Sequence, residues 1–417
     1  MRVERITSSR SASAVLRSVA AATADHGLPP PAALSGDWFG AQAVIAPSVA
    51  LEPVPVDRVF ELDSRAAGVL ASETVGGGWV GYLSYPDPGS DRRGPRLPEA
   101  AGGWTDDVLR QDTCGTWWYE SLSGKSAPSW LIDAVSAPSR PGHWTIDWTE
   151  PDRAAHRAGV LACLDAIGAG EVYQACVCAQ FVGVLTGTPV DFFADVVART
   201  APARAAFVSG DWGAVASLSP ELFLRRTGDT VTSSPIKGTL PLHRPPAALR
   251  ASVKDVAENV MIVDLVRNDL SRVALTGTVT VPELLAVRRA PGVWHLVSTV
   301  SARVDGAVSM ATLLEATFPP ASVTGTPKSR ARQLLSGWEP FGRGVYCGTV
   351  GFASPAAGTE LNVAIRTVEF DTAGRAVLGV GGGITADSDP EAEWQECLDK
   401  AAAIVGADAQ RRIPAQS

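Results

Sequence analysis

The sequence predicts a protein of the α+β class, in which strands pair mainly with one another and helices cover them. Two observations favour this class over a doubly wound parallel sheet. Strand-like runs outnumber helical ones after residue 170, and several follow each other directly, as at 213–217 and 222–225. A parallel α/β sheet would instead show strands and helices in strict alternation.

The individual elements are predicted from apolar periodicity and from turn residues. Strands are expected at 43–45, 79–85, 115–119, 213–217, 222–225, 233–236, 350–353, 361–369 and 376–380. Helices are expected at 190–199, 252–270, 310–317, 328–336 and 390–405. A further helix should begin near Thr149-Glu150-Pro151-Asp152, which offers an N-cap and an early proline. We place the main boundary near residue 148, which divides an N-terminal region, 1–148, from a second region, 149–417.

Composition excludes several classes of function. The net charge is −8 and the pI is about 5.3, so a broad basic surface for nucleic acid is not expected. The sequence shows neither a signal peptide nor an apolar run of about 18 residues, so no membrane attachment is expected. Six cysteines in 417 residues do not resemble a disulfide framework, and Cys176 and Cys178 are expected to be a structural thiol pair. A cytoplasmic protein is the expectation.

Two predicted helices carry pairs of carboxylates one turn apart. Asp255 and Glu258 form the first pair, and Glu393 and Glu396 form the second, with Lys400 one turn further along the same face. Two carboxylates on each of two helices suit Mg²⁺, when substrate oxygens and water complete its shell. Spacing alone favours the alternative, two solvated acidic faces.

Three further positions carry side chains that are unusual for their surroundings. Lys237 ends an apolar, glycine-flanked run, where a lysine is either functional or reaches the surface by its flexible stem. Glu221 stands at the start of a strand, as a functional carboxylate or a turn residue. His295 lies in an apolar strand-like run, where a hydrogen-bonded core histidine is the commoner case. Gly381-Gly382-Gly383 follows a strand and is either an anion-binding backbone or a simple turn.

Taken together, these segments resemble the chorismate-utilising enzymes: anthranilate synthase component I, aminodeoxychorismate synthase component I, and the isochorismate and salicylate synthases. The likeness runs from about residue 149 to 405 and keeps the order of the family's motifs. These motifs are AGEVYQ at 169–174, SPE at 219–221, PIKGT at 235–239, DVAENVMIVDLVRND at 255–269, HLVS at 295–298, TGTPK at 324–328, IRT at 365–367, GGGI at 381–384 and the Glu393/Glu396/Lys400 helix. The resemblance implies large antiparallel sheets packed as a sandwich, with helices outside.

The resemblance also implies roles for the marked residues. Glu258 and Glu396 would bind Mg²⁺, with Asp255 and Glu393 supporting them. The metal, Lys400 and the N–H groups of Gly382 or Gly383 would hold the ring carboxylate of chorismate. Arg366 and Tyr346 would hold its enolpyruvyl carboxylate. Thr239 and Gln174 would also contact the substrate, and His295 would be an active-site histidine.

One residue ranks the members of the family. Isochorismate-type enzymes use a lysine as base at the position of Gln174, so water addition is disfavoured. Anthranilate synthases usually carry alanine at the position of Lys237, whereas aminodeoxychorismate synthases carry lysine there. The resemblance then implies covalent attack of Lys237 on C2 of chorismate, with Glu221 as general acid, and amination at C4 to 4-amino-4-deoxychorismate for 4-aminobenzoate and folate synthesis.

The source of ammonia is expected to be a second protein. No cysteine has the Gly-x-Cys-x-Gly surroundings of a glutaminase nucleophile, so a separate glutamine amidotransferase is expected as the partner. Two alternatives remain open: an anthranilate synthase component I, and a non-catalytic regulatory protein on the same fold.

Overall fold

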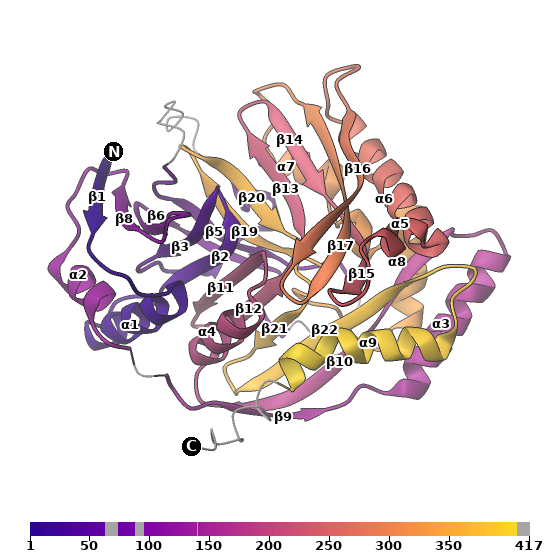
Figure 1. The fold of residues 1–417 in the computed structure, drawn as a ribbon, viewed down its shortest axis with the longest axis horizontal. Coiled ribbons are helices and arrows are strands. Elements are labelled where there is room, and N and C mark those ends of the chain that lie inside the picture. Colours follow the sequence, from indigo (N-terminus) through magenta and orange to yellow (C-terminus); the bar gives the residue numbers. More distant parts are fainter. Residues whose placement is uncertain (63–73, 88–95, 140, 407–417) are drawn as a thin grey trace.

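The computed structural model of the chain describes residues 1–62, 74–87, 96–139 and 141–406. Across these ranges the strands form two large antiparallel sheets, and helices lie on their outer faces (Figure 1). The α+β class and the antiparallel sandwich predicted from the sequence are confirmed.

The first sheet contains strands from both ends of the chain. Its order is β1 (Arg2–Ile6), β8 (Trp117–Ser121), β7 (Asp107–Gln111), β3 (Ala41–Ala46), β2 (Ala32–Trp38), β11 (Arg204–Gly210), β12 (Gly213–Ser219), β21 (Thr367–Phe370), β22 (Arg375–Ile384), β10 (Gln174–Thr186) and β18 (Gly325–Thr326). The short strand β9 (Thr145–Thr149) pairs with the far end of β10.

The second sheet is built in the same mixed way. Its order is β15 (Ile236–Pro241), β17 (Val293–Arg303), β14 (Thr230–Ser234), β13 (Leu222–Thr227), β20 (Gly358–Asn362), β19 (Thr349–Ser354), β5 (Gly78–Leu83), β6 (Ala100–Thr105) and β4 (Glu52–Pro53). The long strand β16 (Thr280–Ala290) pairs with β17.

The inner faces of the two sheets share one apolar core. Leu34 and Val44 come from the first sheet, and Tyr82, Val350 and Phe352 from the second, and all are almost fully buried. Because successive side chains of a strand point to opposite faces of the sheet, every second side chain of these strands points away from this core, towards the outer face of its sheet. The sandwich is therefore held together by burial of apolar surface between the sheets.

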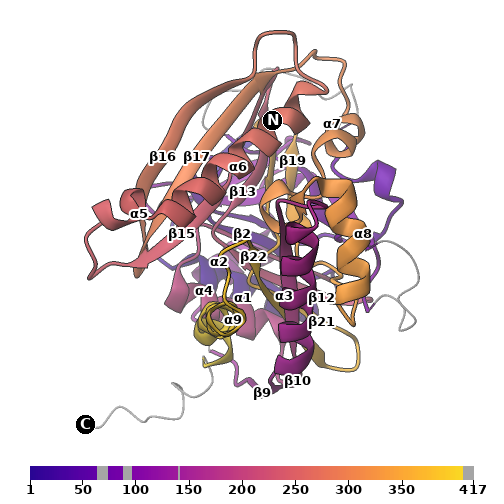
Figure 2. The same ribbon diagram turned by 90° about the vertical axis from the view of Figure 1, so that its right-hand side faces the viewer.

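Nine helices in the described ranges cover the outer faces (Figures 1 and 2). They are α1 (Ala12–Asp25), α2 (Ser129–Ser136), α3 (Arg153–Gly168), α4 (Pro189–Thr200), α5 (Ala247–Ala251), α6 (Val253–Ser271), α7 (Met310–Thr317), α8 (Lys328–Trp338) and α9 (Pro390–Val405). For the site, the important contacts are those of α6 with β15 and β17, and of α9 with β22. These contacts bring α6 and α9 to the same end of the sandwich.

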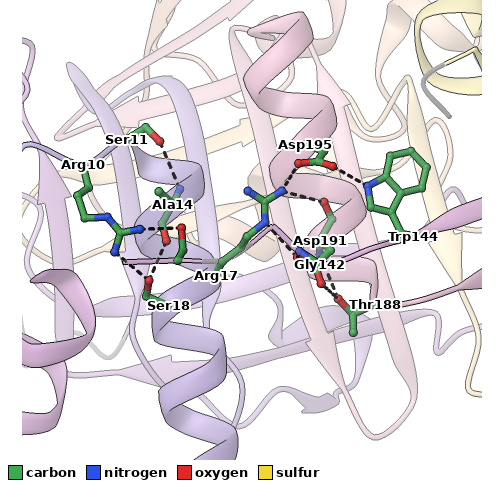
Figure 3. Close-up of polar contacts among 11 residues, drawn as sticks. Arg10, Ser11, Ala14, Arg17, Ser18, Gly142, Trp144, Thr188, Asp191 and Asp195 are labelled. Atoms are coloured by element: carbon green, nitrogen blue, oxygen red, sulfur yellow. Dashed lines mark hydrogen bonds and ion pairs between the residues drawn. The ribbon is translucent and has the colours of Figure 1, made fainter. Parts of the chain in front are cut away.

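The N-terminal residues join the rest of the protein through both sheets and through α1. Strand β2 pairs with β11, and β5 pairs with β19. Arg17 on α1 forms ion pairs with Asp191 and Asp195 on α4, and Asp195 also accepts a hydrogen bond from the Trp144 indole (Figure 3). Residues on the two sides of position 148 thus share one framework, and the boundary there stays a prediction.

One local prediction was wrong. The run 361–369 is not one strand, because β20 ends at Asn362, β21 begins at Thr367, and Arg366 between them has a φ of 51°. This error arises because the tertiary structure overrides a short local pattern.

The helix start predicted at Thr149-Glu150-Pro151-Asp152 is confirmed. Helix α3 begins at Arg153, and the carboxylate of Asp152 caps it by accepting from the N–H groups of Ala154 and Ala155.

Candidate active site

A cleft of about 580 Å³ opens between the end of the second sheet, the end of β22, and helices α6 and α9. Twelve of the fourteen predicted site residues line it: Glu221, Lys237, Thr239, Asp255, Glu258, His295, Tyr346, Arg366, Gly382, Gly383, Glu396 and Lys400. The other two, Gln174 and Glu393, are buried, and their side-chain oxygens approach the same Gly382–Gly383 backbone.

Four carboxylates reach this end of the cleft from α6 and α9. Oxygens of three of them lie near the Gly382–Gly383 backbone: a Cβ at Gly382 would lie 2.8 Å from Oε2 of Glu393 and 3.8 Å from Oε1 of Glu396. A Cβ at Gly383 would lie 3.8 Å from Oε2 of Glu258. The two glycines therefore leave open the space that a side chain would fill. In an antiparallel strand successive N–H groups point to opposite sides, so one of the two points away from β10.

Several oxygens in this region are buried without a hydrogen-bond partner. They are Oε1 of Glu258, Oε2 of Glu393 and Oε1 of Gln174. Buried acceptors are normally satisfied, and a cation is the partner that carboxylate and amide oxygens would share. Among the described residues, no group of three or more His, Cys, Asp or Glu side chains is spaced to hold a metal by itself. The donor set thus fits Mg²⁺, which takes only one or two carboxylates and completes its shell with water and substrate oxygens.

The pKa values of the two candidate metal ligands are shifted in opposite directions. Burial raises the pKa of Glu258, against the pull of Lys237 and Lys254. Burial also works to raise the pKa of Glu396, but Lys400 outweighs it and the net shift is downward. Lys400 forms an ion pair with Glu396 at 2.7 Å and donates to the Gly381 carbonyl at 2.7 Å. Burial therefore disfavours the charged form of Glu258, and a further positive charge beside it would stabilise that form.

Lys237 lines the cleft together with Glu221 and Glu258. Its Nζ would be 3.4 Å from a Cβ at Gly383, close to Gln174, and its charge acts on both Glu221 and Glu258. The next residue, Gly238, has a φ of 89°, and a Cβ there would come within 3.0 Å of Asp255. A larger residue at 238 would therefore displace either α6 or the lysine.

Glu221 is the most strongly perturbed acid that lines the cleft. It follows β12 and directly precedes β13, and it is 4% exposed. Burial raises its pKa to about 7, although hydrogen bonds from the Ser322 hydroxyl and the Ile236 N–H oppose the shift, as does Lys237. A carboxyl group with this pKa is protonated about half of the time at pH 7, which suits a general acid.

His295 and Thr239 lie opposite each other on β17 and β15. The Thr239 hydroxyl and Nδ1 of His295 are hydrogen-bonded at 3.0 Å. Burial, with the nearby Arg366, lowers the pKa of His295 to about 4, so its ring is neutral at pH 7. A neutral imidazole can donate or accept one hydrogen bond towards the cleft, but it adds no charge.

Arg366 and Tyr346 also line the cleft. The left-handed backbone of Arg366 interrupts the chain between β20 and β21, and its own carbonyl accepts from the Leu218 N–H at 3.0 Å. Tyr346 is 5% exposed, and its ring packs against Gly379, where a Cβ would come within 2.2 Å. The lining of the cleft therefore includes a guanidinium, which can bind a carboxylate through two hydrogen bonds, in addition to the carboxylate cluster.

Sequence reasoning missed three residues that hold these groups in place. Lys254 donates to Oε1 of Glu393 at 3.0 Å, and Ser388 donates to the same oxygen at 2.7 Å. The N-cap of α9 is the next residue, Asp389, which leaves the Ser388 hydroxyl free for this contact. Ser322 donates to Glu221. Of these, only Lys254 had a local signal, since it lies four residues before Glu258 on a predicted helix.

Comparison with known proteins identifies the family. The sequence profile of the chorismate binding enzymes matches residues 56–406. The chain belongs to the chorismate-binding enzyme family. Within it, the chain is 41% identical over 238 residues to aminodeoxychorismate synthase component 1 of Salmonella typhimurium, which covers 55% of this chain and 52% of that protein. It is 36% identical over 272 residues to anthranilate synthase component 1 of Streptomyces coelicolor, covering 63% and 52%.

These alignments span about half the length of the relatives. Solved structures of the chorismate-binding family confirm the fold. Anthranilate synthase component I of Streptococcus pneumoniae superposes with a TM-score of 0.71 at 24% identity, over 90% of each chain. The menaquinone-specific isochorismate synthase MenF of Escherichia coli superposes with a TM-score of 0.73 at 20% identity, over 98% of this chain and 94% of that one.

Two further expectations concern the whole chain. All six cysteines are free, and Cys176 and Cys178 are both buried on β10, in line with the absence of a disulfide framework. In the part of the chain that the structure describes, no helix is long and apolar enough to cross a membrane.

Proposed function

We propose that this protein aminates chorismate at C4, giving 4-amino-4-deoxychorismate for 4-aminobenzoate and folate synthesis in the cytoplasm. The observation that carries this proposal is the position of Lys237 between Glu221 and Glu258 in the cleft. A lysine amine is a nucleophile, and the adjacent Glu221 has the pKa of a general acid at neutral pH. The relatives named aminodeoxychorismate synthase component 1 support the same choice.

The proposed reaction has two displacements. The neutral amine of Lys237 forms a bond to C2 of chorismate, the ring double bonds shift, and the C4–O bond breaks. Glu221 gives its proton to the departing hydroxyl, which leaves as water. Ammonia then forms a bond to C4, the double bonds shift back, and the C2–N bond to Lys237 breaks. The covalent step directs nitrogen to C4, because attack from Lys237 occupies C2.

The remaining groups bind and orient the substrate. Arg366 and Tyr346 take the enolpyruvyl carboxylate, and Lys400 with a glycine N–H takes the ring carboxylate. Mg²⁺, held by Glu258 and Glu396, would supply the positive charge that keeps this ring carboxylate beside an acidic cluster. Asp255 and Glu393 support the two ligands, and Lys254 and Ser388 fix Glu393.

The proposed partner is a separate glutamine amidotransferase that supplies ammonia. The designation "component 1" of the aminodeoxychorismate synthase and anthranilate synthase relatives supports an assembly with a second component. Ammonium salt should replace this partner in vitro, because the proposed chemistry needs only ammonia at C4.

The deciding experiment incubates the purified protein with chorismate, MgCl₂ and ammonium chloride, and resolves the products by chromatography. A product that aminodeoxychorismate lyase converts to 4-aminobenzoate is expected. Fluorescent anthranilate would instead establish the C2-aminating alternative, for which relatives at 36% identity also exist. No Mg²⁺-dependent consumption of chorismate would leave the non-catalytic alternative.

The rate advantage that Glu221 provides should fall on the alkaline side of pH 7. Glu221 must be protonated to act as an acid, and its pKa is raised to about 7, so the protonated fraction falls about tenfold per pH unit above that value. The measurement is kcat/KM for chorismate from pH 6 to 9 in wild type and in Glu221→Gln, with total ammonium adjusted to keep free ammonia constant. Near pH 7 the replacement should lower the rate by about 10² to 10⁴. The ratio of the two rates should then decrease as the pH rises, because the ionisation of Lys237 affects both proteins equally and cancels in the ratio. A ratio that stays constant to pH 9 would contradict the role of Glu221.

A further inference from the structure

Two charged residues in the most distinctive sequence motifs have no role in the proposed reaction. Asp269 ends the DVAENVMIVDLVRND motif on α6, and Lys328 ends the TGTPK motif and begins α8. They form an ion pair at 2.6 Å, and both side chains are largely buried. Lys328 also donates to the Thr317 and Pro319 carbonyls at 2.7 and 2.8 Å. The pair is therefore held in place by several contacts, and neither residue lines the cleft.

A small cavity connects this pair to the catalytic acid. Its volume is about 20 Å³, and both Glu221 and Asp269 line it. The hydroxyl-bearing residues Ser233, Thr317 and Ser322 line it as well, among apolar side chains. A cavity of this size holds a single water, and a water needs two to four polar neighbours, which these residues provide. Two carboxyl-bearing and three hydroxyl-bearing residues thus line one water-sized cavity, with Glu221 and Asp269 both among them.

Asp269 also lines a hollow on the outer surface of the helices. This second hollow is a much larger groove of about 1080 Å³ between α6, α7 and α8. This groove has charged residues along it, among them Asp264, Arg272, Glu315 and Arg332. Asp269 therefore lines both the small cavity that reaches Glu221 and a groove on the outside of the helices.

The proposed reaction creates a need for such a connection. Glu221 gives one proton to the departing hydroxyl in each turnover and ends as a carboxylate. The bond from ammonia to C4 leaves an ammonium group, which keeps its proton in the product. Chorismate occupies the cleft on one side of Glu221, so a proton that enters from the other side restores Glu221 without waiting for the product to leave. Besides the cleft, Glu221 lines the small cavity that Asp269 also lines.

We propose that Asp269 restores the proton of Glu221 through this cavity. The Asp269 carboxyl gives a proton to the cavity water, which gives another to Glu221, and Asp269 regains one from solvent in the outer groove. Lys328 positions Asp269 and is not itself a proton donor in this sequence. This inference rests on the proposed function of Glu221 as a general acid.

The electrostatics of the two carboxyls fit such a transfer. Burial raises the pKa of Asp269 to about 6, against Lys328 and Arg272, and that of Glu221 to about 7, against Lys237 and Lys400. The two values are close, so a proton moves between them at little free-energy difference. An ordinary surface aspartate, with a pKa near 3.9, would rarely carry the proton to be passed on.

The test uses the full-length protein with ammonium chloride in place of the partner, so that only the chemistry at this site is measured. Asp269→Asn keeps the shape but removes the proton carrier. It should lower kcat about tenfold or more, leave KM for chorismate within about twofold, and raise the solvent deuterium isotope effect on kcat. Imidazole, a small buffer that can carry protons, should restore part of kcat. The matched control is Glu120→Gln, a buried carboxylate paired with Arg110 and remote from the cleft, which should keep the wild-type isotope effect.

A second variant covers the possibility that Asp269→Asn does not fold. Thr317→Val fills the same volume, leaves the Asp269–Lys328 pair in place and removes one hydroxyl from the cavity wall. It should lower kcat several-fold with the same isotope signature. Wild-type kcat in both variants, or a loss of kcat with neither an isotope effect nor imidazole rescue, would overturn the relay. Formation of 4-amino-4-deoxychorismate by the wild-type protein tests the proposed function separately.

Discussion

Replacement of Lys237 by Met is expected to abolish C4 amination, with a fall in kcat of roughly a thousandfold or more. Methionine keeps most of the volume and the apolar stem but lacks the amine that bonds to C2. KM for chorismate should change little, because Arg366 and the carboxylate-binding groups remain. The measurement is single-turnover product formation with ammonium chloride. Incubation of the wild-type protein with chorismate and no ammonia should also leave a chorismate-derived adduct on Lys237, detectable by mass spectrometry.

Lys125→Met is the matched control for this prediction. Lys125 is exposed and lies outside the cleft, so the same substitution there should leave the kinetics unchanged. Normal turnover by Lys237→Met would reject covalent catalysis. Production of anthranilate by that variant would be a different result, since it would show that Lys237 selects the carbon that is aminated without being required for binding.

Replacement of Glu258 by Gln is expected to weaken Mg²⁺ binding by about a hundredfold or more, beyond the usual effect of changing a supporting residue. It removes the negative charge of one of the two proposed carboxylate ligands, whose Oε1 is buried without a hydrogen-bond partner. The measurement is a calorimetric titration with Mg²⁺, with and without chorismate. The metal-free variant should also unfold at a higher temperature than wild type, because burial disfavours the charge of Glu258 and raises its pKa.

Glu391→Gln provides the control on the same helix as Glu396. Glu391 is about half exposed and pairs with Arg153 outside the cleft, so Mg²⁺ affinity should be unaffected. Glu393→Gln should weaken Mg²⁺ binding by less than Glu258→Gln, since it acts through its neighbours. Equal Mg²⁺ affinity in wild type and Glu258→Gln would place the metal elsewhere or remove it from the proposal.

Part of the site could be predicted from the sequence because it depends on residues that are close together in the chain. The i, i+3 spacing of Asp255 with Glu258, and of Glu393 with Glu396, puts each pair on one helical face in any context where the helix forms. The PIKGT run and the SPE run are short and continuous, so their residues keep their relative places whatever surrounds them. Resemblance to a family then joined these separate segments, which spacing alone left ambiguous with solvated surface.

Other parts depended on contacts that no local pattern contains. Serine is a common N-cap residue, yet the Ser388 hydroxyl donates to Glu393, because Asp389 accepts from the N–H groups at the start of the helix. The break at Arg366 follows from left-handed backbone between two strands of different sheets, where periodicity predicted one strand. Ser322 contacts Glu221 although about a hundred residues separate them.

By itself, the amino-acid sequence determined the α+β class, most helix positions, the carboxylate pairs and the membership implied by the ordered motifs. These depend on periodicity and on residue type, which are properties of a short stretch of chain. Only the tertiary structure decided the charge states: Glu221 reaches a pKa of about 7 and His295 falls to about 4 because segments distant in sequence bury them. The same packing creates the cavity between Glu221 and Asp269, since desolvation and enclosed space arise only where several elements meet.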